Sequence, residues 1–432
     1  MSLSRRKFLA TGVASAAVIS GTTQIPELLL QAAAAPSAGG ARSENVLVVL
    51  QLSGGNDGLN TVVPYADDVY ARNRFQTRIS AAQAHKLNDY LGLHPSMAGM
   101  HRLFQEDLLT IIQGVGYANP NRSHFESMDI WHTAQPKAKR DARQVGWLGN
   151  YLDSVNSKHP AYAKNDVPAV HLGNEVQPLA LAGLHVQVPS IGSFDDFRFD
   201  EVNNRQLAAA RDKLLSAAAT DVNELVAHVR AAAQTALASS RRVRNAIARQ
   251  TNSADYPQTN LGKKLRGIAQ LIQAGLSTRI YYVTLDGFDT HSLQTESHAG
   301  LLRELSGAVT AFIDDLTHTG QSDRVLLACF SEFGRRVKEN ASRGTDHGAA
   351  APMFLASGRL RGGLVGEHPS LTDLDDGDLK FHTDFRRVYA SLLEQWLGVP
   401  SAPLLGGTFK QCRNPKVELD RLLALGKSAR TK

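Results

Sequence analysis

The sequence predicts an α/β protein, a three-layer sandwich in which a mostly parallel central sheet lies between two layers of helices. Short, continuous apolar runs are typical of strands that are buried on both faces. Helical patterns lie between several of these runs, and this alternation indicates parallel strands joined by right-handed crossovers. The apolar runs are residues 46–52, 108–113, 169–172, 280–285, 325–330 and 353–356.

Two helical patterns are clear along the chain. Residues 301–316 place apolar side chains on one face, and so do residues 384–397 near the end. Residues 204–250 are rich in alanine and free of glycine and proline, with a periodic pattern. We predict that this segment forms one or two long helices, as an insertion packed beside the sheet.

The first 35 residues are predicted to be a twin-arginine signal peptide. Arg5 and Arg6 precede a short apolar stretch rich in Ala, Gly and Thr, and the alanine run at 32–35 offers small-residue cleavage sites. The stretch is shorter than the roughly 20 apolar residues that a bilayer span needs, so no permanent membrane span is expected. We expect residues 43–432 to form the working domain, exported by the twin-arginine translocase to the periplasm or the outside of the cell.

Composition excludes several classes of function. The formal net charge is +6, without a dense basic block, which argues against nucleic-acid binding. The chain has no CxxC, haem-attachment or GxGxxG motif, so no cradle for an organic redox cofactor is visible. Cys329 lies in an apolar run and is expected to be a buried thiol, while a disulfide with Cys412 remains open.

Polar residues follow several of the predicted strands, where ligands bind in open α/β sheets. Asp57 follows the first strand inside a glycine-rich turn, where a metal-binding carboxylate would sit, although it could also cap a helix. Asp289 and His291 follow run 280–285 and could converge on one cation, or form only a polar turn.

Two later segments add further candidates. Glu332 and Arg335 follow run 325–330, and Arg335 could either pair with Glu332 or hold an oxyanion of the substrate. His347 precedes run 353–356 and is a candidate metal ligand. Its neighbour Asp346 is either a second ligand or a partner that fixes the imidazole tautomer.

Ser123 opens a predicted helix over residues 123–133. A hydroxyl at a helix N-terminus faces free N–H groups, a favourable place for a phosphoryl or sulfuryl group, so Ser123 is a candidate nucleophile and Arg122 a candidate anion clamp. The pattern from Ser123 to Glu126 is also that of a capping box, in which Ser123 only caps the helix. His124 and Glu126 are weaker candidates for the same site.

Taken together, five segments resemble a bacterial family of twin-arginine-exported proteins of unknown function, grouped with the alkaline phosphatase, sulfatase and phosphoglycerate mutase superfamily. The resemblance spans essentially the whole mature chain. It implies an alkaline phosphatase-like fold, two metal ions at the strand ends, often zinc or manganese, and a Ser or Thr nucleophile. The segments are Leu-Ser-Gly-Gly-Asn-Asp-Gly-Leu-Asn at 52–60, Asn-Arg-Ser-His-Phe at 121–125, Gly-Phe-Asp-Thr-His at 287–291, Ser-Glu-Phe-Gly-Arg at 331–335 and Thr-Asp-His-Gly at 345–348.

The resemblance assigns roles to single positions. Asp57 resembles the metal-ligand aspartate after the first strand, Ser123 lies where the nucleophile region falls, and His347 resembles the late histidine ligand. Asp289 and His291 resemble the aspartate–histidine ligand segment, although the superfamily usually spaces that pair more widely.

The chain departs from the superfamily pattern at Glu332 and Phe333, where the active enzymes carry an Asp-His pair. The missing imidazole favours one metal ion, or a harder cation such as calcium, manganese or magnesium held by carboxylates.

Two hypotheses follow from the sequence. The first is an exported metal-dependent hydrolase acting on an anionic phosphate or sulfate ester, with a serine or water nucleophile. The second is a catalytically degenerate binding or assembly protein that keeps the scaffold and works with another exported protein. The candidate catalytic residues are Ser123 and Arg335, and the candidate metal ligands are Asp57, Asp289, His291, Glu332, Asp346 and His347.

Overall fold

A computed structural model describes residues 44–156, 168–192, 254–276 and 278–410. The predicted signal peptide, the predicted helical insertion at 204–250 and Cys412 all lie outside these ranges. None of the helices within them is both long and apolar enough to span a bilayer.

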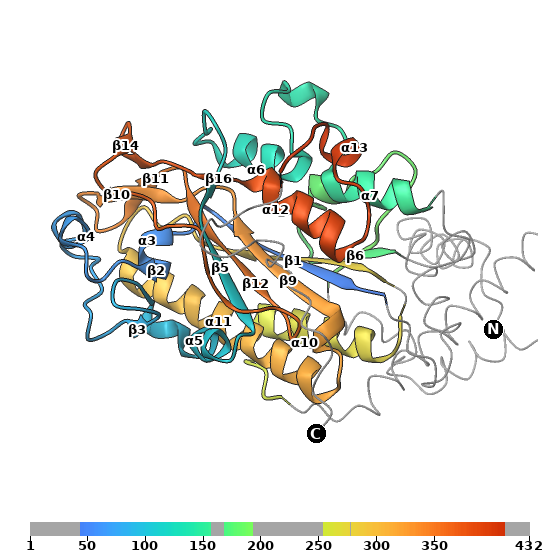
Figure 1. The fold of residues 1–432 in the computed structure, drawn as a ribbon, viewed down its shortest axis with the longest axis horizontal. Helices are drawn as coiled ribbons and strands as arrows, with labels where there is room; N and C mark the ends of the chain where they lie inside the picture. Colours follow the sequence, from blue (N-terminus) through green and yellow to red (C-terminus); the bar gives the residue numbers. More distant parts are fainter. Residues whose placement is uncertain (1–43, 157–167, 193–253, 277, 411–432) are drawn as a thin grey trace, which may run out of the picture.

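A nine-stranded sheet forms the centre of the molecule (Figure 1). Its strands are β1 (Val46–Ser53), β5 (Leu109–Gly116), β6 (Ala169–Leu172), β7 (Ser190–Ile191), β8 (Ile280–Asp286), β9 (Val325–Ser331), β12 (Ala351–Ala356), β13 (Gly363–Val365) and β16 (Thr383–Asp384). The order across the sheet is β13-β5-β12-β9-β1-β8-β6-β7, and β16 also pairs with β5. All six predicted apolar runs are strands of this sheet.

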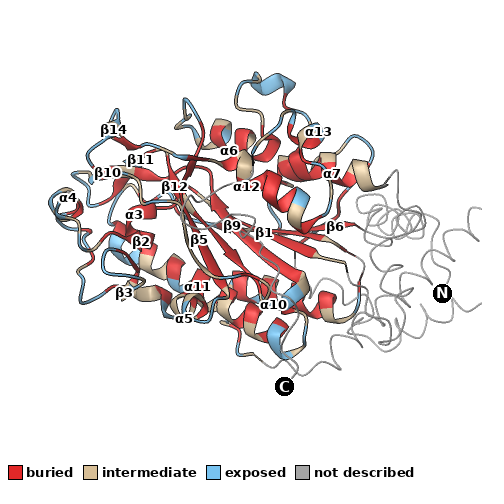
Figure 2. Ribbon diagram, in the orientation of Figure 1, coloured by how far each residue is buried: buried red, intermediate tan, exposed pale blue. Residues whose placement is uncertain are grey.

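Both faces of the sheet are buried (Figure 2). Successive side chains of a strand point to opposite faces, so in β1 Val48 and Leu50 join one core cluster while Leu47 and Val49 join the other. Burial on both sides explains why these strands appear in the sequence as continuous apolar runs.

Helices cover the two faces, which confirms the predicted α/β architecture with a mostly parallel sheet (Figure 1). One face carries α5 (Ala98–Gln105), α10 (Asn260–Gln273) and α11 (Gln294–His318). The other carries α6 (His124–Thr133), α7 (Trp147–Asn156), α12 (Phe385–Ser391) and α13 (Ala402–Leu405). The predicted helix at 301–316 lies within α11, and the one at 384–397 is α12 continued by a π-helical turn over Leu392–Trp396.

One strand of the sheet runs against the others. β12 pairs antiparallel with both β5 and β9, whereas the remaining pairs of this sheet are parallel. β12 therefore begins at the edge where β1, β8 and β9 end. Just before it comes β11 (Thr345–His347), which pairs antiparallel with β10 (Arg335–Glu339). A parallel strand here would have placed His347 at the opposite edge.

Short elements surround the edge where β1 ends, at the left of Figure 1. They are α3 (Gly58–Thr61), β2 (Val62–Val63), α4 (Asp68–Asn73), β3 (His85–Lys86), β4 (Gly92–Leu93), β14 (Leu374–Asp375) and β15 (Asp378–Leu379). The loops that leave β1, β5, β8 and β9 meet at this edge.

Candidate metal centre

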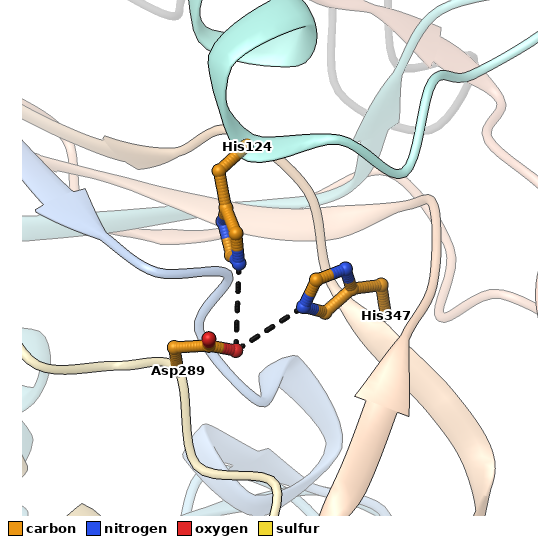
Figure 3. Close-up of side chains that lie close together, drawn as sticks. All are labelled: His124, Asp289 and His347. Atoms are coloured by element: carbon orange, nitrogen blue, oxygen red, sulfur yellow. Dashed lines mark hydrogen bonds and ion pairs between the residues drawn. The ribbon is translucent and has the colours of Figure 1, made fainter.

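Three side chains converge at the ends of the parallel strands: His124, Asp289 and His347 (Figure 3). Their ligand atoms lie within 4.8 Å of one another, and among the described residues this is the one group of its kind. Asp289 Oδ1 lies 3.1 Å from His347 Nε2 and 3.4 Å from His124 Nε2. Two imidazoles and a carboxylate form a ligand set that suits a transition-metal ion such as zinc or manganese.

Glu332 holds the imidazole of His124. Its buried Oε1 lies 2.8 Å from His124 Nδ1, and it also accepts a hydrogen bond from the Gly54 amide. Because a carboxylate can only accept, Nδ1 carries the proton and Nε2 faces the cluster. The hydrogen bond to Glu332 raises the pKa of His124 despite burial, which acts in the opposite direction. Nε2 is itself buried and has no hydrogen-bond partner, so it is a nitrogen that a cation would satisfy.

His347 is held in a similar way by the main chain. Its Nδ1 lies 2.7 Å from the carbonyl oxygen of Arg122, so Nδ1 is the donor and Nε2 is directed inward. Burial lowers the pKa of this imidazole. Nε2 lies 3.1 Å from Asp289 Oδ1 and 2.9 Å from His291 Nε2, and a cation bound there would replace these contacts. Fixing Nδ1 so that Nε2 is free is how proteins orient metal-binding histidines.

Asp289 is ionised and anchored by Arg335. Burial would raise the pKa of Asp289, but hydrogen bonds from Arg335 and His347 outweigh it and lower the pKa to about 2. Arg335 Nη2 donates to Asp289 Oδ1 at 2.8 Å. The guanidinium is buried and also donates to the carbonyl oxygens of Gly54, Gly55, Phe288 and Thr345. Arg335 therefore joins the loops after β1 and β8 to the β10–β11 hairpin, and its donors are turned toward the protein.

Two further predicted residues lie at the rim of the cluster. His291 Nε2 lies 3.1 Å from Asp289 Oδ1 and 2.9 Å from His347 Nε2. His291 Nδ1 lies 3.4 Å from Asp346, whose carboxylate also accepts from Asn340. The structure thus places Asp346 behind His291, as Glu332 lies behind His124.

Asp57 lies elsewhere, with its carboxylate sealed in the interior. Arg74 donates to both of its oxygens, at 2.5 and 3.0 Å, and Gln294 donates to one of them at 2.5 Å. Burial alone would raise the pKa of Asp57, but the charge and hydrogen bonds of Arg74 lower it from 3.8 to about 2. Asp57 is fully buried and is not among the residues whose ligand atoms converge, so it lies outside the proposed ligand set.

Ser123 is exposed at the start of α6, directly before His124. Its hydroxyl makes no capping hydrogen bond, and Glu126 instead pairs with Arg143 at 2.5 Å. The capping-box alternative is therefore wrong, because each of its two side chains lacks the bond that defines the motif.

Phe333 packs against the cluster of His124, Asp289 and His347, at a position where the resemblance suggests an imidazole. Its ring centroid lies 4.9 Å from that of His124 and 4.8 Å from that of His347. Gly55 lies against the same ring, and a Cβ there would collide with it. Phe333 therefore shields one side of both imidazoles from water.

His124 is a weak candidate from the sequence alone, yet the structure places it in the cluster with Asp289 and His347. The available signal was its place beside Ser123 in a loop that follows a strand, but the apparent capping box gave that segment a structural explanation. The residues around His124 in the sequence do not reveal that Glu332, which is distant in sequence, fixes the imidazole ring of His124.

Fold and site together define an α/β protein with a candidate metal centre at the strand ends. Residues 44–389 match the model of DUF1501, described as a protein of unknown function, and the chain belongs to this family. A search of the curated proteins returned no match.

Several solved structures are similar to the chain at low identity. The C-terminal periplasmic domain of EcEptC from Escherichia coli has 10% identity and a TM-score of 0.39, covering 87% of this chain and 89% of that one. The lipoteichoic acid synthase LtaP from Listeria monocytogenes has 8% identity and a TM-score of 0.39, covering 88% and 80%. The PsFucS1 sulfatase from Pseudoalteromonas sp. has 9% identity and a TM-score of 0.36, covering 88% and 70%. Likeness of this degree says nothing about the chemistry of this chain, which has to come from its own residues.

Proposed function

We propose that this protein is an exported, metal-dependent hydrolase of phosphate or sulfate esters. The observation that carries the proposal is the buried Nε2 of His124, which has no hydrogen-bond partner and lies 3.4 Å from Asp289 beside the inward-directed Nε2 of His347. The resemblance of the sequence to the alkaline phosphatase and sulfatase superfamily supports the reaction class. The arginine pair at Arg5 and Arg6 supports export.

His124, Asp289 and His347 would hold the cation, with His291 at its edge. Two imidazole nitrogens favour zinc or manganese, because calcium and magnesium prefer sites built of oxygen ligands. A bound divalent cation supplies positive charge that polarises the ester and stabilises the negative charge that develops on its oxygens.

The chain supplies the remaining parts of the site. Ser123 presents an exposed, uncapped hydroxyl at the first turn of α6, so it is the candidate nucleophile, with water as the alternative. Free N–H groups at the start of this helix favour an anion next to Ser123. Phe333 keeps water from one side of the cluster, which strengthens electrostatic interactions within it.

A non-catalytic binding protein is the second candidate, and the placement of two residues favours it. Asp57 is neutralised by Arg74, and Arg335 is committed to carbonyl oxygens and Asp289. Both groups therefore stabilise the loops in this structure. In this reading a cation would order the strand ends and present a surface to another exported protein.

Elemental analysis of the mature protein tests the first proposal. Samples are the wild type, His124→Ala, His347→Ala and, as a matched control, His185→Ala, which changes an exposed histidine elsewhere. We expect about one metal equivalent per chain in the wild type and the control, and a loss of metal in the two site variants.

The same samples are then assayed with p-nitrophenyl phosphate, bis(p-nitrophenyl) phosphate and p-nitrophenyl sulfate. Hydrolysis of at least one ester should disappear together with the metal, and Ser123→Ala should lose turnover while keeping the metal. Metal without hydrolysis of any ester would favour the binding protein, and absence of both would remove the hydrolase from consideration.

A further inference from the structure

A cleft of about 660 Å³ opens beside the metal centre. Arg122 lines it, and the carbonyl oxygen of the same residue fixes His347. Ala349, two residues after His347, lines it as well. The same two chain segments therefore form the wall of the cleft and hold a ligand of the candidate metal. Its volume is in the range of sites that hold small molecules.

The cations in the wall are already neutralised. Arg122 lies 2.6 Å from the buried carboxylate of Asp378 and 3.1 Å from the exposed carboxylate of Asp376. Lys380 pairs with Asp373. A second anionic group of a substrate, such as another phosphate, would therefore find no uncommitted positive charge among these residues.

The wall nevertheless offers many hydrogen-bonding atoms. Asn119, Asn121 and Asp375 line it. The side-chain oxygen of Asn121 already accepts from the Ser123 amide, which leaves its NH2 group as a donor. In the described part of the chain Asp375 has no partner for its exposed carboxylate. An amide both donates and accepts, and a carboxylate accepts from several donors.

Pro120, Ala349, Leu379 and Phe381 also line the cleft, so its wall is mixed. A long acyl chain would contact these residues but would leave the polar groups without water or a partner. Hydroxyl groups match these polar groups, because each one donates and accepts.

We infer that this cleft binds the alcohol half of the ester, and that this half is a neutral, hydroxyl-rich group such as a sugar or polyol. The inference rests on the proposed function for the identity of the reacting group at the metal. The binding of the hydroxyl-rich group depends only on the cleft, so it can be measured separately.

Two variants and two kinds of probe test the inference. Asn119→Gly with Asp375→Ala removes an amide and a carboxylate, and glycine tolerates the φ of 56° at position 119. Asp141→Ala, an exposed carboxylate outside the cleft, is the matched control. Calorimetry measures the affinity of the zinc-loaded protein for glucose 1-phosphate and for octyl phosphate. Saturation-transfer NMR measures the binding of neutral methyl α-D-glucopyranoside to the metal-free protein.

We expect glucose 1-phosphate to bind about ten-fold more tightly than octyl phosphate, and the double variant to lose about that factor for glucose 1-phosphate alone. The glucoside signal should persist in the wild type and Asp141→Ala and fall in the double variant. Tighter binding of octyl phosphate, or equal glucose 1-phosphate affinity in the double variant and wild type, would overturn the inference.

The two proposals fail separately. If the glucoside signal falls in the double variant but the protein holds no metal and hydrolyses no ester, only the proposed hydrolase activity is excluded. If hydrolysis depends on metal but no glucoside signal is seen, only the proposed binding of hydroxyl groups in the cleft is excluded.

Discussion

Glu332 determines which nitrogen of His124 faces the metal cluster. It accepts from Nδ1 at 2.8 Å and is itself fixed by the Gly54 amide and the Ser331 hydroxyl. A residue outside the proposed ligand set thus orients one of the proposed ligands. The sequence favours Glu332 as a metal ligand, but in the structure its carboxylate binds the imidazole of His124 and is not part of the cluster.

Replacing Glu332 by glutamine should weaken metal binding by about 10- to 100-fold. A glutamine can offer its N–H₂ group to Nδ1, which permits the tautomer whose Nε2 carries the proton and cannot bind a cation. Zinc affinity measured by competition with a chelator checks this, with Glu106→Gln on the surface beside α5 as the control. Unchanged affinity would show that Glu332 does not set the tautomer.

Asp57 should govern stability in acid. Its pKa is lowered in the folded state, so it contributes stability that is present above pH 4 and is lost as the pH falls from 3.8 toward 2. The shift corresponds to about 2 kcal/mol. Asp57→Asn should be less stable than the wild type by about 3–5 kcal/mol at pH 7, because Arg74 is left as a buried, unpaired charge.

The check is the free energy of unfolding of both proteins between pH 6 and 2. The gap between wild type and Asp57→Asn should narrow as the pH falls below 4. A gap that stays constant over this range would mean that Asp57 is not held ionised by Arg74.

The loops after β1 and β8 are packed closely together. Gly54 has a φ of 114°, and a Cβ at this position would lie 2.8 Å from the carbonyl carbon of Phe288 and collide with the amide of Asp289. The absence of a side chain at Gly54 therefore lets Asp289 approach the loop after β1. The amide of Gly54 in the same loop also holds Glu332.

Gly54→Ala should displace the β8 loop and abolish metal binding, with a loss of stability of about 1–3 kcal/mol from backbone strain. Metal content and thermal unfolding of the variant check this. Gly275→Ala is a suitable control, because it shares the positive φ but has open space around the added methyl. Normal metal content in Gly54→Ala would show that the two loops can separate without loss of the site.

The elements also show where sequence reasoning reaches its limit. The six buried strands and helix α11 follow from apolar periodicity, since burial on one or both faces leaves a direct pattern in the residues. The direction of β12 leaves no such pattern, because a doubly buried strand reads the same in both orientations. The sequence does not identify Arg74 as the partner of Asp57 either, because only the fold brings this arginine to the carboxylate.

At the scale of the whole molecule, two apolar layers enclose the sheet and the polar cluster lies at one edge of it. The candidate ligands come from α6, the loop after β8 and β11, so the cluster exists only when the sheet is complete. Export of the folded chain would carry such a site intact, and this agrees with the predicted twin-arginine signal.

Changing Arg5 and Arg6 together to lysine should stop export, because the arginine pair is the defining part of the predicted signal and the lysines preserve only its charge. Cell fractionation with immunoblotting should then show the precursor inside the cell, whereas wild-type protein is expected outside the cytoplasmic membrane. Lys7→Arg is the matched control, since it exchanges the same two residue types directly beside the pair. Undiminished export of the double variant would contradict the twin-arginine route.

The position of β1 in the sheet has a consequence for synthesis on the ribosome. β1 is the first strand of this sheet to be made, yet its two neighbours are β8 and β9, whose residues lie between 280 and 331. Until those residues emerge, both hydrogen-bonding edges of an apolar strand lack their native partners, a state that folds slowly and tends to aggregate. The nascent chain therefore exposes an unpaired apolar strand during most of its translation, and the proposed export of the folded protein would have to wait until both neighbouring strands have been made.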